Sequence, residues 1–102
     1  MDKHGLGRER ERQVMQRYMD DGFVCWQPAR AKYANQDIVG LFDFVAIDTH
    51  GNVNLVQVCH TNSIAAKGAA IESWWAQWAD PAFECTLYAA SAKGIVCVRG
   101  WP

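Results

Sequence analysis

The feature of this sequence that most constrains its fold is a hairpin pattern between residues 41 and 60. Two segments rich in β-branched and aromatic residues, Leu41–Ile47 and Val53–His60, flank a short polar stretch that contains Gly51-Asn52. This arrangement predicts two antiparallel strands joined by a turn. Both faces of the first strand are apolar, so we expect it to lie in the centre of a sheet.

Asp43 is the unusual residue of that first strand. In a regular strand Asp43 would share a face with Val45, while Phe42 and Phe44 would take the opposite face. A buried charge is costly, so such a carboxylate is normally paired, protonated or bound to a metal. The alternative is an Asp at the edge of a strand whose oxygens accept hydrogen bonds from backbone amides. The residues alone leave both interpretations open.

The rest of the chain supplies two helices and three more strands around this hairpin. Apolar residues at helical spacing mark the two helices, with Gly22 ending the first and Asp80-Pro81 ending the second. The expected elements are a helix over 8–21, a strand over 23–26, the hairpin, a helix from 62 or 63 to 80, and strands over 84–90 and 95–99. The sequence of 102 residues therefore predicts one α/β domain of order αβββαββ, with a mixed central sheet flanked by helices.

The second expected helix carries Trp74, Trp75 and Trp78 on one stripe with Lys67 and Ile71. A Trp-rich stripe at this spacing is typical of a core or a subunit interface, and less often of a surface that stacks on bases. Five Trp exceed what so small a core hides easily, so we expect a homodimer.

Cysteine spacing and hydropathy predict an intracellular, cytoplasmic protein. The four cysteines lie far apart without zinc-finger spacing, which is typical of free thiols in a reducing compartment. The chain has no run of about 18 apolar residues and no signal-peptide pattern, so we expect a soluble protein without a membrane partner.

The charges are unevenly distributed along the chain. Residues 1–34 hold seven Lys or Arg against five acids, whereas the remainder holds three against six. Clustered basic groups can contact the phosphate backbone of DNA without reading bases. The alternative is an ordinary solvated helix face with Arg and Glu at helical spacing. The candidate nucleic-acid-binding residues are Arg8, Arg10, Arg12, Arg30 and Lys32.

Three polar positions now form a series: Glu11 on the first helix, Asp43 on the second strand and Gln57-Val58-Cys59 on the third. With the surrounding Gly7–Met15 and Asp21-Gly22-Phe23, the chain resembles the PD-(D/E)XK nuclease superfamily, and within it the archaeal type of Holliday-junction resolvase. The resemblance spans about residues 5–100 and rests on short motifs. It implies a restriction-endonuclease-like core and a homodimeric, metal-dependent endonuclease acting on branched DNA.

The resemblance also implies roles for individual residues. In the family, the helix Glu, the strand Asp and the acid of the triplet gather Mg²⁺ (or Mn²⁺), and the triplet Lys orients or activates water. Glu11 and Asp43 match, Gln57 stands in the acid position with an amide oxygen that can still bind a metal, and Cys59 replaces the Lys. Lys67 is a candidate for the missing cation. The alternative is that the chain has a nuclease fold without catalytic activity and binds DNA or another protein.

The turn of the hairpin decides whether these residues can meet. In a regular hairpin that pairs Asp48 with Val53, Asp43 would lie opposite Val58 and Gln57 would face the other way. The family's site therefore requires a bulge or an irregular loop, expected at residues 50–52. We expect His50 and His60 to be structural or solvated.

Overall fold

The computed structural model describes residues 3–28 and 38–102. Within them the elements follow the order expected from the sequence. They are α1 (Lys3–Asp20), β1 (Val24–Trp26), β2 (Phe44–Ile47), β3 (Val53–His60), the short 3-10 helix η1 (Thr61–Ser63), α2 (Ile64–Trp78), β4 (Phe83–Ser91) and β5 (Gly94–Trp101).

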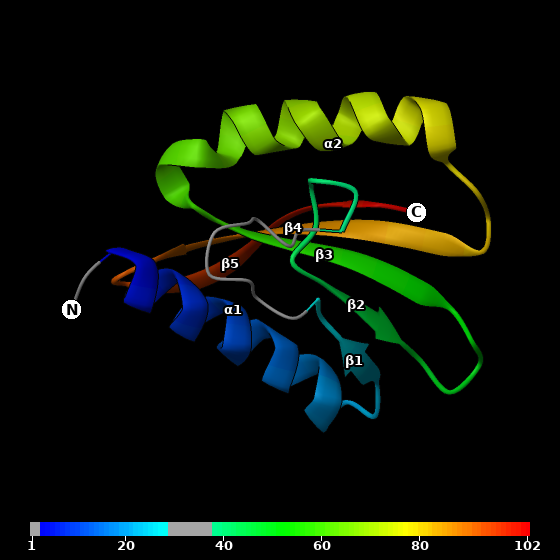
Figure 1. Cartoon of the computed structure of the whole chain (residues 1–102), viewed down its shortest axis with the longest axis horizontal. Coiled ribbons are helices and arrows are strands. Elements are labelled where there is room, and N and C mark those ends of the chain that lie inside the picture. Colours follow the sequence, from blue (N-terminus) through cyan, green and yellow to red (C-terminus); the bar gives the residue numbers. More distant parts are fainter. Residues whose placement is uncertain (1–2, 29–37) are drawn as a thin grey trace.

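The strands form one mixed sheet of order β1-β2-β3-β4-β5. β3 and β4 are parallel, and the other neighbouring pairs are antiparallel. A parallel pair needs a crossover connection, which η1 and α2 provide here. α1 and α2 cover opposite faces of the sheet (Figure 1). The α/β class and the mixed sheet between two helices are therefore confirmed.

Each face of the sheet has its own hydrophobic core. The core under α2 contains buried Phe42, Cys59, Ile71, Cys85, Leu87 and Trp101. The core under α1 contains Val14, Phe44, Ala46 and Val56. The central strands contribute to both cores, which explains why their sequences are apolar on both faces.

The first strand of the hairpin is shorter than expected, since β2 begins at Phe44 instead of Leu41. The backbone of Ile38 and Phe42 exchanges hydrogen bonds of 2.8 and 3.0 Å, which holds the preceding residues in a turn. The expectation that Phe42 and Phe44 share a face is therefore wrong, because they pack in the α2 and α1 cores respectively. Asp43 lies between them, directly before β2.

The loop between β2 and β3 is irregular, as expected at residues 50–52. Ile47 pairs with Val53 and Phe44 with Val56, so the loop contains the five residues 48–52. Asp48 Oδ1 accepts hydrogen bonds from the backbone N–H groups of His50 (2.8 Å) and Asn52 (2.9 Å). This loop shifts the register by one residue relative to a regular hairpin and brings Asp43 beside Gln57 rather than opposite Val58.

α2 packs on the sheet through Ile71 and two of its three Trp residues. The Trp74 ring centroid lies 5.2 Å from that of Phe42, and the Trp75 centroid lies 5.7 Å from that of Phe83. Trp78, expected on the same stripe, is instead 62% exposed, because it is the last residue of α2 and lies past these contacts. The homodimer stays a prediction. Neither described helix combines the length and hydrophobicity needed to cross a membrane.

Candidate functional site

Asp43 is fixed against β3 by two hydrogen bonds. Its backbone N–H donates to the Val56 carbonyl at 2.8 Å, and its Oδ2 accepts from the Val58 N–H at 2.8 Å. The hydrogen bond from the Val58 N–H agrees with the alternative in which the Asp43 oxygens accept from backbone amides at the edge of a strand. A carboxylate has two oxygens with several acceptor positions, so this bond orients the group and still permits a metal ion to bind. Asp43 thus reaches β3 directly beside Gln57.

Gln57 has a buried amide oxygen that the described protein does not satisfy. Its side chain is on the α2 side of β3, in register with Leu87 of the α2 core, and is 5% exposed. Nε2 donates a long hydrogen bond of 3.4 Å to the Val58 carbonyl. Oε1 has no donor among the residues that the structure describes. A buried acceptor without a partner costs about 1–3 kcal/mol, a cost that a bound cation would remove.

Two groups of opposite charge act on Cys59. The thiol is buried, and burial raises its pKa; Lys67 opposes the rise, whereas Asp43 adds to it. Gln57 and Cys59 both face the α2 side of β3. Lys67 lies on the first turns of α2, which directly follows β3 and η1.

The thiol environment predicts a specific order of chemical labelling. Burial raises the pKa of Cys59 and raises that of Cys85 to about 12, so both remain protonated at neutral pH, whereas Cys97 is exposed. We expect iodoacetamide at pH 7.5 to label Cys97 first and to label Cys59 and Cys85 only after unfolding, as measured by peptide mass spectrometry. Cys97→Ser is the control. Labelling of native Cys59 as fast as Cys97 would contradict the buried, neutral thiol.

Glu11 has different neighbours from these four residues. It lies on α1, one turn before core residue Val14, and is 8% exposed. It lines a shallow pocket of about 190 Å³ with Arg8, Arg12 and Gln27. Its place on α1 and its burial agree with the position expected from the sequence. A metal ion shared by Glu11, Asp43 and Gln57 stays a prediction.

The donor set determines which metal could bind. Across residues 3–28 and 38–102, no three His, Cys, Asp or Glu side chains gather into a metal-binding group. A site on Asp43 would therefore need the amide oxygen of Gln57 as a ligand. These oxygen donors suit Mg²⁺ or Mn²⁺.

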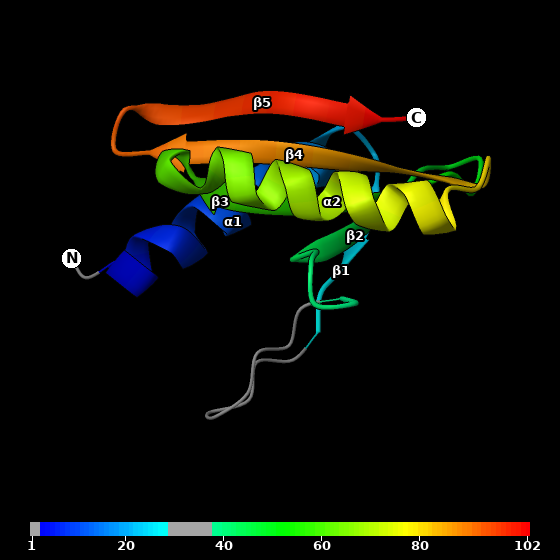
Figure 2. The same cartoon turned by 90° about the horizontal axis from the view of Figure 1, so that it is seen from above.

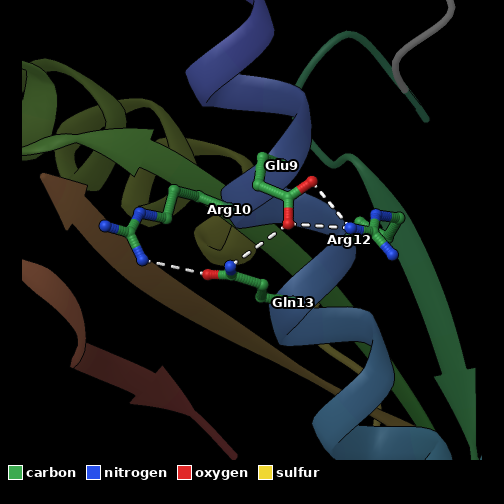
Figure 3. Close-up of polar contacts among 4 residues, drawn as sticks. All are labelled: Glu9, Arg10, Arg12 and Gln13. Atoms are coloured by element: carbon green, nitrogen blue, oxygen red, sulfur yellow. Dashed lines mark hydrogen bonds and ion pairs between the residues drawn. The ribbon is translucent and has the colours of Figure 1, made fainter. Parts of the chain in front are cut away.

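The basic residues of α1 are partly engaged with one another (Figure 3). Arg12 Nη2 contacts both carboxylate oxygens of Glu9 at 2.7 Å, and Gln13 links Glu9 to Arg10. The Arg12 guanidinium lowers the pKa of Glu9, and Glu9 raises that of Arg12. These contacts agree with the alternative of a solvated helix face for part of α1. Arg8 is exposed, whereas Arg30 and Lys32 lie outside the described residues.

One contact of α1 was missed by sequence reasoning. Arg10 Nη2 donates to the Ala92 carbonyl, 3.2 Å away, in the turn between β4 and β5. The two residues are 82 positions apart, so no local pattern could have revealed the contact. It fastens the start of β5 to α1.

Comparisons with known proteins bear on the fold alone. No protein-family model and no curated protein sequence matches the chain. One solved structure, described as a protein of unknown function from Silicibacter pomeroyi, is similar with a TM-score of 0.53 and 17% sequence identity. The match covers 95% of this chain and 72% of the other. The likeness supports the arrangement of helices and strands.

Proposed function

We propose that the chain is a metal-dependent endonuclease that hydrolyses phosphodiester bonds in DNA, with selectivity for branched structures such as four-way junctions. The observation that carries this proposal is the buried Gln57 Oε1, which lacks a donor within the described residues and lies beside Asp43. Lys67, on the first turns of α2, is the candidate for the Lys that the resembling family has in its triplet, and its charge acts on the Cys59 thiol. A carboxylate, an unsatisfied amide oxygen and an ammonium group together are suited to a metal-assisted reaction at a phosphate.

Each candidate residue has a role that follows from its chemistry. Asp43 and Gln57, with Glu11 from α1, would hold Mg²⁺ or Mn²⁺ through hard oxygen ligands. When bound, the ion would supply positive charge at the scissile phosphate and acidify a water molecule. The hydrogen bond from the Val58 N–H orients the Asp43 carboxylate before any ligand arrives. Preorganised groups of this kind avoid a reorganisation cost during the reaction.

Lys67 would take the role of the missing triplet Lys. It is half-buried on α2, and its charge acts on the thiol of Cys59. Because Cys59 is protonated, it does not form an ion pair with Lys67, and the ammonium group can serve an attacking water or a phosphate oxygen. Cys59 is then an uncharged side chain at the position where the resembling family has its triplet Lys.

The test is a cleavage assay on a labelled four-way junction, a matched duplex and a single strand in Mg²⁺, Mn²⁺ or EDTA. We expect cutting in either metal, fastest on the junction, and none in EDTA. Binding to the junction without cutting in either metal would contradict the enzyme. It would favour a catalytically degenerate DNA-binding module, to which the replacement of Lys by Cys59 points. A chain that neither binds nor cuts any of the three DNAs would reject both functions.

A further inference from the structure

We propose that DNA docks on one end of the molecule and that Lys93, in the turn between β4 and β5, binds a phosphate there. This inference rests on the proposed action on DNA. It adds a contact from the C-terminal half of the chain to the candidates on α1. Three observations carry it: the distribution of charge, the fastening of the turn by Arg10, and the exposure of Lys93.

The charged residues are separated along the long axis of the molecule. Figures 1 and 2 both place the N-terminal half of α1, the start of α2 and the β4–β5 turn at the same end. The described basic side chains in or next to these segments are Arg8, Arg10, Arg12, Lys67 and Lys93, against the acids Glu9, Glu11 and, beside Val58, Asp43. Since Arg12 and Glu9 pair with each other, the remaining charge at this end is positive. A polyanion is attracted to such an end.

The opposite end carries acids. The loop between β2 and β3 contains Asp48, the connection from α2 to β4 contains Asp80, and Glu84 is the second residue of β4. Asp48 and Glu84 line the same hollow of about 280 Å³. Arg99 on β5 forms an ion pair with Glu72 at 2.7 Å. DNA is therefore repelled from this end, which fixes the direction of approach.

Arg10 holds the turn in place instead of reaching outward. Its Nη1 donates to Gln13 Oε1 at 3.0 Å and its Nη2 to the Ala92 carbonyl at 3.2 Å. Its Nε is buried and has no acceptor among the described residues, whereas the bond from its Nη2 to Ala92 lies at the exposed surface. Arg10 is thus a positioning residue for the turn rather than a direct phosphate contact.

Lys93 follows directly after the residue that Arg10 binds. Its backbone N–H donates to Ser91 Oγ at 3.2 Å, so the main chain of the turn is held at the Lys93 N–H and at the Ala92 carbonyl. Its side chain is exposed. An exposed ammonium group on a turn held in this way can neutralise a phosphate.

The test measures the affinity for a fluorescein-labelled duplex at several salt concentrations, without divalent metal. Neutralising one phosphate contributes a slope of about 0.9 in log K against log salt, so Lys93→Ala should lower the slope by about that amount and weaken binding about 5- to 10-fold near 0.1 M salt. Lys93→Arg should retain binding. Arg10→Met should weaken binding like Lys93→Ala and should speed hydrogen exchange in the turn.

Arg17→Ala is the matched control, since Arg17 is exposed in the last turn of α1, away from this end. It should change neither affinity nor slope, and thermal melting should show that every variant is folded. Unchanged binding in Lys93→Ala, or an equal loss in Arg17→Ala, would overturn the inference and leave the proposed nuclease intact. Failure of the unmodified chain to bind DNA would overturn both.

Discussion

Replacing Asp43 by Asn is expected to reduce metal-dependent DNA cleavage by on the order of 100-fold or more. The reason is that loss of a side chain that binds the metal directly reduces activity more than loss of a side chain that only orients a metal ligand. Asn keeps the size of Asp and an oxygen that can accept the hydrogen bond from the Val58 N–H. The attachment of β2 to β3 should survive while the negative charge disappears. The rate constant for cleavage under single-turnover conditions measures the loss.

Asp20→Asn is the matched control for this change. Asp20 is an exposed carboxylate near the end of α1 that accepts a hydrogen bond from Gln16 at 2.9 Å. The Asp20→Asn variant should cleave DNA at the rate of the unmodified protein. The two variants should melt within a few degrees of the unmodified protein. Full cleavage by Asp43→Asn would remove Asp43 from the catalytic site, whatever the effect of other substitutions.

Replacing Phe44 by Ala is expected to lower the free energy of unfolding by about 3–5 kcal/mol, as for other fully buried aromatic residues. Phe44 has no exposed surface, packs in the α1 core and makes an edge-on contact with Tyr18, with ring centroids 5.9 Å apart. Domains of this size have stabilities of about 5–15 kcal/mol, so the variant should be close to unfolding. Urea denaturation followed by circular dichroism measures the change.

Val24→Ala serves as the control for the core prediction. Val24 lies on the short edge strand β1 and is 71% exposed. Its truncation should change the free energy of unfolding by less than about 0.5 kcal/mol, as is usual at the surface. A loss below about 1 kcal/mol in Phe44→Ala would mean that the α1 core is not packed as described.

The order of elements could be predicted because its signals are local. Alternating apolar residues in β3 and helical spacing in α2 reflect the environment of each residue directly. The start of β2 could not be predicted, because the backbone hydrogen bonds between Ile38 and Phe42 hold the apolar residues Leu41 and Phe42 in a turn before the strand. α1 begins at Lys3 instead of Arg8 and includes two glycines that the sequence analysis placed outside it. Helix propensity is a weak guide at such ends.

The candidate site could be predicted in part. The hairpin register had to depart from a regular turn for Asp43 to meet Gln57, and the five-residue loop provides this departure. Lys67 lies on the first turns of α2 as expected, and its role beside Gln57 stays a prediction because it depends on how α2 packs over the sheet. The link from Arg10 to Ala92 joins distant segments and has no signature in the sequence.

The central claim is that Lys67 supplies the cation that Cys59 cannot, and the most direct measurement is the Mn²⁺-dependent cleavage rate of three proteins. They are the unmodified chain, Lys67→Ala, and Lys67→Ala combined with Cys59→Lys, which places a Lys at the third position of the Gln57-Val58-Cys59 triplet. We predict that Lys67→Ala loses cleavage by about 10²- to 10³-fold, as for other groups that stabilise developing charge, and that the double variant recovers much of it. Undiminished cleavage by Lys67→Ala would contradict the claim.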